Sequence, residues 1–206
     1  LITFALLLVL IFSAAGYLLS LPGVGDAQQR VQMILAEHHA VASRMPPPAK
    51  LAEAIVAVED EHFYSNFLVN ILDGAGRAAL ATLQRSGDPG GSTIAQQLAK
   101  QLYGHGSGLT GTLREIGLGV KLSLEYPKPV ILSMYLNAVY YGNGYWGDEA
   151  AAHGYFSIRP RALDWAQAAM LAGLPQAPSA YDPRTHLVWS AGASGTCWIS
   201  LSSTTS

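Results

Sequence analysis

Two glutamates on separate predicted helices are the side chains best suited to acid–base chemistry. Glu59 ends a predicted helix that begins at Ala49, and it borders the apolar stripe of that helix. Partial burial and the dipole at a helix C-terminus both disfavour a charged carboxylate, which favours a general base at Glu59. The alternative interpretation is a solvated acidic helix end.

Glu115 is the second candidate, because it lies among the apolar residues Leu113, Ile116 and Leu118 on a helix with few charges. The alternative is a surface glutamate beside Arg114, which is the commoner environment for this residue type. Paired carboxylates supplied by different helices are typical of glycosyl chemistry. The two glutamates therefore predict that class of reaction if they reach one cleft.

The segment from Gly90 to Lys100 is the element expected to lie between them. It begins with a Gly-Gly turn, and Thr93 followed by Gln96 has the spacing of a helix-capping box. Gln96, Gln97 and Lys100 lie off the apolar stripe of this helix, near a helix start whose free N–H groups suit an anion. The alternative is an ordinary capped surface helix.

Composition favours a membrane-associated or alanine-rich helical protein. The 206 residues are 50% hydrophobic and only 13% charged, and the net charge of -2 gives no electrostatic case for a nucleic-acid partner. Cys197 is the single cysteine, so no internal disulfide forms. The six histidines are scattered, and no set of residues has the spacing of metal ligands.

The chain divides into four parts. Residues 1–21 are uncharged and close to the ~20 residues of a transmembrane anchor, with a cleaved signal peptide as the alternative. Residues 22–48 are a partly helical connector that ends in three prolines. Residues 49–186 form the globular domain, and residues 187–206, which carry no Asp, Glu, Lys or Arg, are a disordered or aberrant tail.

The fold class predicted for the domain is mainly α. Apolar periodicity, capping residues and Gly or Pro breaks place helices at residues 49–59, 67–83, 93–102, 113–124, 130–141, 148–156 and 163–172. No run of alternating strands is present in the sequence.

Several motifs occur in an order that resembles one enzyme family. They are Glu59-Asp60-x-x-Phe63, the segment Gly90–Lys100, Ile131-Leu132-x-x-Tyr135-Leu136-Asn137, and the segment Ala169–Ser179. In this order they are similar to the peptidoglycan glycosyltransferases of glycosyltransferase family 51, which include monofunctional transglycosylases and the N-terminal domains of class A penicillin-binding proteins. The resemblance covers about residues 51–183.

The resemblance implies a lysozyme-like, two-lobed helical domain beside the extracytoplasmic side of a bacterial cell membrane, held by one membrane-spanning helix. It implies polymerisation of lipid II into glycan strands, with inversion at the anomeric carbon and release of undecaprenyl pyrophosphate. The implied partners are lipid II, the growing glycan strand, the membrane and other cell-wall synthesis proteins. Since no transpeptidase domain follows, the monofunctional type is expected.

The resemblance also implies residue roles. Glu59 is the general base on the acceptor 4-hydroxyl, and Glu115 organises the donor pyrophosphate with basic residues or a divalent metal ion, Mg or Mn. Lys100 neutralises the leaving pyrophosphate. Asn137 supports the site, or is a helix-packing amide. The implied substrate-binding residues are Asp60, Arg77, Ser92, Thr93, Gln96, Gln97, Lys100, Arg114 and Asn137.

Some positions depart from the family pattern. The basic residues that normally precede the second glutamate are replaced by Gly111 and Thr112, which leaves Arg114 and His105 as the nearby cations. Asn66 takes the place of a histidine. Two alternatives stay open. The loss of this basic pair and the unusual tail motivate a catalytically impaired homologue that binds lipid II or a cell-wall partner, and a lysozyme-like hydrolase would use Glu59 as its acid.

Overall fold

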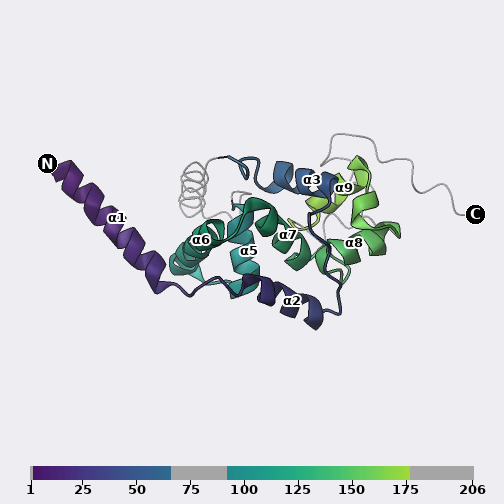
Figure 1. The fold of residues 1–206 in the computed structure, drawn as a ribbon, viewed down its shortest axis with the longest axis horizontal. Coiled ribbons are helices and arrows are strands. Elements are labelled where there is room, and N and C mark those ends of the chain that lie inside the picture. The colour runs from purple at the N-terminus through teal and green to yellow at the C-terminus, as the bar shows by residue number, and fades with distance from the viewer. Residues whose placement is uncertain (1, 66–91, 177–206) are drawn as a thin grey trace, which may run out of the picture.

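The computed structural model describes residues 2–65 and 92–176, and within these ranges the chain is helical (Figure 1). A single backbone bridge between Tyr140 and Trp146 is the only strand-like pairing in the described part. The mainly α class predicted from the sequence is confirmed. The helices are α1 (Ile2–Ser20), α2 (Ala27–Glu37), α3 (Ala49–Glu59), α5 (Ile94–Tyr103), α6 (Gly108–Glu125), α7 (Lys128–Ala138), α8 (Gly147–Phe156) and α9 (Trp165–Gly173), with a short 3-10 helix η1 (Pro160–Ala162).

Helix α7 lies at the centre of the core. All residues from Ile131 to Ala138 are buried, so this helix has no solvent-facing side along most of its length. It packs against α5, α2 and α8, while α3 packs against α9 and α5 against α6. The apolar face of α5, predicted from the spacing of Ile94, Leu98 and Leu102, is buried in this core.

Helix α2 belongs to the core although the sequence placed it in a connector. Ala27, Val31 and Leu35 repeat every four residues and are almost fully buried. They face α7, which α2 contacts directly. The segment that joins α1 to α3 is therefore a structural part of the helical body.

Helix α1 extends away from the helical body (Figure 1). Most of its described side chains are apolar and exposed, and Phe4, Val9 and Phe12 each show more than 60% of their surface to solvent. Near its end, the Lys121 ammonium of α6 donates hydrogen bonds to the carbonyls of Leu21 (2.8 Å) and Pro22 (3.0 Å). Across residues 2–65 and 92–176, no helix combines the length and the hydropathy that crossing a membrane requires.

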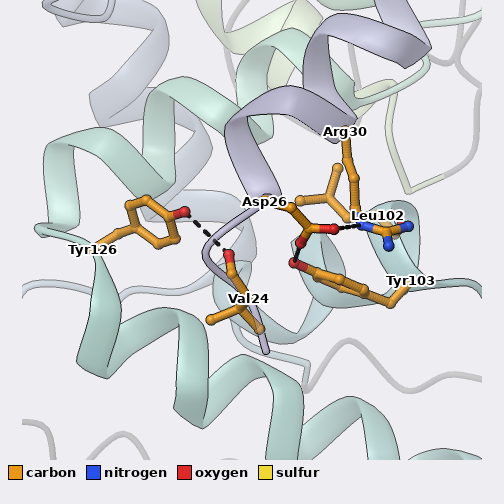
Figure 2. A network of polar contacts seen from close by, with 6 residues as sticks. All are labelled: Val24, Asp26, Arg30, Leu102, Tyr103 and Tyr126. Carbon is orange, nitrogen blue, oxygen red and sulfur yellow. Dashed lines mark hydrogen bonds and ion pairs between the residues drawn. The ribbon is translucent and has the colours of Figure 1, made fainter. Parts of the chain in front are cut away.

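A network of polar contacts fixes the start of α2 against α5 and α6 (Figure 2). The Asp26 carboxylate accepts hydrogen bonds from the Tyr103 hydroxyl at 2.9 Å and from Arg30 Nε at 2.8 Å, and the Arg30 guanidinium lies 4.6 Å from the centre of the Tyr103 ring. The Tyr126 hydroxyl donates to the Val24 carbonyl at 3.0 Å. The Tyr103 hydrogen bond lowers the pKa of Asp26, and burial raises the pKa of Tyr103 well above its usual value.

Some sequence-based predictions lie outside the described residues. They concern Asn66, the helix at residues 67–83, the substrate-binding role of Arg77, the Gly-Gly turn at 90–91 and the tail at residues 187–206.

Candidate active site

The Gln97 side chain connects Glu59 to the core. Gln97 Nε2 donates a hydrogen bond to Glu59 Oε2 at 2.7 Å, and Gln97 Oε1 accepts one from the Tyr135 hydroxyl at 3.0 Å. Glu59 is only 8% exposed at the end of α3, and Tyr135 is fully buried on α7. The pKa of Tyr135 is raised well above 10 by burial and then by the Glu59 charge, so the tyrosine remains a hydrogen-bond donor.

Asp60 occupies the N-terminus of α5. Its Oδ2 accepts a hydrogen bond from the Ile94 backbone N–H at 3.2 Å, and the predicted capping box between Thr93 and Gln96 is present in both directions. The side chains of Asp60 and Thr93 therefore accept hydrogen bonds from the first backbone N–H groups of α5, which were expected to be free for a ligand anion. The negative charge at this helix start comes from the protein itself.

A small cavity lies beside Asp60, between the first turn of α5 and the middle of α6. Its volume is about 20 Å³, enough for one water molecule. Gly119 of α6 approaches α5 so closely that an added β-carbon would lie 2.9 Å from Gln96 Cγ. Lys128 also lines the cavity; its ammonium lies 4.7 Å from the centre of the Phe63 ring, and burial lowers its pKa while Asp60 opposes this.

Glu115 lies with a different group of residues. Its Oε1 is 2.6 Å from His105 Nδ1, and its side chain is 18% exposed. Arg114 donates from Nη1 to the Tyr103 carbonyl at 3.1 Å, and Lys100 is exposed in the last turn of α5. The candidate residues thus fall into a group around Glu59 and a group around Glu115, each built on a different part of α5.

Asn137 is tied to neighbouring backbone. Its Oδ1 accepts from the Ser43 N–H at 2.7 Å, and its Nδ2 donates to the Ser133 carbonyl at 2.8 Å. The side chain is 5% exposed and borders a separate groove of about 350 Å³ between α2 and α7. These contacts are those of a helix-packing amide. Ser92, the remaining substrate-binding candidate in the described ranges, is partly exposed, and its carbonyl accepts from Gln97 Nε2 at 3.4 Å.

Two buried polar residues were not assigned a role from the sequence. Tyr135 lies in the motif Ile131-Leu132-x-x-Tyr135-Leu136-Asn137. Its hydroxyl, at an otherwise apolar position of the helix, was the sequence signal that could have identified it. Asp148 is completely buried in the first turn of α8, where burial raises its pKa to about 7. Nothing in the sequence distinguishes it from an exposed acidic residue at a helix start. Among the side chains that the structure describes, no three form a metal-binding group, so the metal ion stays a prediction.

Comparison with known proteins decides the family. Residues 26–199 match the family model described as Transglycosylase, which is most of the chain. The chain belongs to the transglycosylase family. This confirms the resemblance found in the motifs and places the chain among peptidoglycan glycosyltransferase domains.

Curated relatives of this transglycosylase are penicillin-binding proteins. The chain is 38% identical over 141 residues to penicillin-binding protein 1F of Bacillus subtilis, covering 68% of this chain and 20% of that protein. It is 42% identical over 134 residues to penicillin-binding protein 2a of Streptococcus pneumoniae, covering 65% and 18%. It is 41% identical over 138 residues to penicillin-binding protein 1A of Neisseria gonorrhoeae, covering 66% and 17%. The chain thus spans a fifth or less of the length of these relatives.

Proposed function

We propose that the chain polymerises lipid II into glycan strands, with inversion at the anomeric carbon and release of undecaprenyl pyrophosphate. The observation that carries this proposal is the Glu59 carboxylate, nearly buried and held by Gln97 at 2.7 Å. The hydrogen bond from Gln97 fixes the orientation of this carboxylate, and an oriented, nearly buried carboxylate is suited to accept a proton from a bound hydroxyl. Glu59 is therefore prepared to act as a general base.

In the proposed reaction, the acceptor 4-hydroxyl attacks the anomeric carbon of the donor. The hydroxyl proton passes to Glu59, and the bond from the anomeric carbon to the diphosphate oxygen breaks with its electron pair on the diphosphate. The leaving group gains one negative charge, which cationic side chains stabilise. Lys100, exposed at the end of α5, is the residue proposed for this role. A divalent metal ion, where one is used, adds charge neutralisation at the diphosphate.

We also propose that α1 holds the domain at the extracytoplasmic face of a bacterial membrane. The exposed apolar side chains of α1 and of Leu109 and Leu113 on α6 support membrane contact, because water would otherwise surround them. The hydrogen bonds from Lys121 to the residues after α1 limit how far the helical body can turn relative to it. A polyprenyl substrate stays in the bilayer, so a tethered domain meets it at a raised effective concentration.

The test is polymerisation of labelled lipid II by the full chain reconstituted in lipid nanodiscs. Glu59→Gln is expected to lower the rate by roughly 100-fold or more. Glu53→Gln is the matched control, since Glu53 lies exposed on the same helix, and it should leave the rate unchanged. The proposal is refuted if the wild-type chain makes no glycan where a related enzyme does, or if Glu59→Gln is fully active.

The same assay separates the other candidate functions. Lipid II binding without turnover would indicate a catalytically impaired homologue, which the uncharged Gly111 and Thr112 motivate. Release of soluble muropeptides from intact cell wall would instead indicate a hydrolase that uses Glu59 as its acid.

A further inference from the structure

His105 and Glu115 form a close pair at the corner between α5 and α6. The Nδ1–Oε1 distance is 2.6 Å, short enough for a charge-assisted hydrogen bond. An ionised carboxylate can only accept a hydrogen bond, so Nδ1–H is the donor and Glu115 Oε1 the acceptor. His105 is 64% exposed, and within the described residues its Nε2 makes no hydrogen bond. The pair therefore fixes the imidazole and, when the ring carries both protons, leaves Nε2–H available to a ligand.

Two glycines make this pairing possible. Gly106, in the loop after α5, packs against Gly111, in the second turn of α6, so closely that a β-carbon on either would overlap the backbone of the other. This contact folds the loop onto α6 and brings His105 to Glu115. A lysine or arginine at position 111 would displace the loop, so a cation at that position and the His105–Glu115 pair exclude each other.

The corner carries an excess of positive charge. Lys100 lies in the last turn of α5, His105 follows in the loop, and Arg114 is bound to the Tyr103 carbonyl. Glu115 is the acidic side chain that contacts this set. With the imidazole protonated, residues 100–115 carry three cations and one carboxylate, and this excess favours a ligand with at least two negative charges.

We propose that His105, held by Glu115, binds the diphosphate of the donor substrate through Nε2–H. This rests on the proposed function. It makes His105 the residue that contacts the leaving group and Glu115 a positioning residue that acts through it. When the bond to the anomeric carbon breaks, the electron pair and the new charge go to the diphosphate oxygen, and the imidazolium stabilises that charge as a hydrogen-bond donor without losing its proton.

The first experiment measures binding of inorganic pyrophosphate, without divalent metal, to the full chain in nanodiscs at about pH 6, where ordinary imidazoles are largely protonated. His105→Gln should weaken binding about 3- to 10-fold, a modest effect because the imidazole is exposed. His105→Lys should retain most of the affinity. His153→Gln, at an exposed histidine of α8, is the matched control and should not change it. Equal binding by wild type and His105→Gln would overturn the inference.

The second experiment tests how His105 is placed. Gly111→Ala keeps both members of the pair but obstructs the loop, so it should weaken binding about as much as His105→Gln does. The double variant should bind no more weakly than either single variant, because both changes remove the same contact. Additive losses would contradict placement by the glycine contact. Glu115→Gln keeps an acceptor oxygen for Nδ1–H and should bind within about threefold of wild type; a loss clearly larger than that of His105→Gln would contradict a role that Glu115 exerts only through His105.

A phospholipid headgroup is the other source of the same phosphate chemistry. If His105→Gln weakens attachment to anionic vesicles of phosphatidylglycerol and leaves pyrophosphate binding unchanged, the corner is a lipid site and the leaving-group role is wrong. The proposed function is separable from this result. Pyrophosphate binding that depends on His105, with no polymerisation by the wild type, would retain the anion site and reject the polymerase. Polymerisation that is unaffected by His105→Gln would retain the polymerase and reject the leaving-group role of His105.

Discussion

Gln97, in the first turn of α5, and Glu59, the last residue of α3, are joined by a 2.7 Å hydrogen bond. The Gln97 amide directs Nε2 at Glu59 because Oε1, on the other side of the amide, accepts a hydrogen bond from the Tyr135 hydroxyl. Tyr135 is fixed within the buried α7. The Gln97 amide therefore links the proposed base to the centre of the core.

Tyr135→Phe should reduce turnover without abolishing it. The change removes the donor that orients Gln97, so the amide can rotate and Glu59 is held less well. We expect kcat to fall by roughly 5- to 10-fold with little change in KM, and stability to fall by about 1 kcal/mol. Tyr64→Phe is the matched control, since Tyr64 is 61% exposed. A kcat equal to wild type in Tyr135→Phe would show that the amide orientation does not matter.

Gly119→Ala should disturb the contact between α5 and α6. The added β-carbon would lie 3.1 Å from the Gln96 backbone, which cannot move without shifting α5. A stability loss of about 1–3 kcal/mol is expected, measured by chemical denaturation. Gly173→Ala in α9 is the control, because nothing lies within 4 Å of its added β-carbon. That variant should be neutral or more stable by about 0.5 kcal/mol. Equal effects of the two changes would rule out the steric explanation.

The sequence predicted the helices and the local signals well. The helix from Ala49 to Glu59 and the capping box at Thr93 have the predicted residues, because both follow from short-range periodicity and capping chemistry. The start of α6 at Gly108 was missed, since glycines there indicated a loop. The Gly106–Gly111 contact explains why glycine is needed at that turn.

Long-range partners could not be predicted in the same way. The bonds of Gln97 join residues 38 positions apart in both directions, and no local pattern specifies them. The complete burial of Asp148 likewise results from tertiary packing, because the acidic residue lies at a helix start where exposure is the ordinary outcome.

Tyr103→Phe should weaken the junction after α1 in a pH-dependent way. The Tyr103 hydrogen bond is the main cause of the lowered pKa of Asp26. Because the pKa of this carboxyl is lower in the folded state, its contribution is present above the unfolded value of 3.8 and is lost as the pH falls through the folded value. The variant should have a lower Tm than wild type at neutral pH, and the difference should shrink as Asp26 is protonated. A Tm difference that stays constant with pH would indicate lost packing alone.

Asp148→Asn should stabilise the protein at alkaline pH. Burial raises the pKa of Asp148 from 3.8 to about 7, so the folded state holds a proton more tightly than the unfolded state does. Folding stability must therefore fall as the pH rises between these two values, and the loss is complete above about pH 7. Asparagine has nearly the same shape and cannot ionise. We expect the variant to be similar to wild type near pH 4 and more stable by about 2–4 kcal/mol near pH 8. Denaturant midpoints at both pH values provide the measurement.

Glu149→Gln, the neighbouring carboxyl and a lesser cause of the shift, should change the pH dependence much less. If wild type and Asp148→Asn differ by the same amount at both pH values, the buried carboxyl does not titrate as its surroundings require.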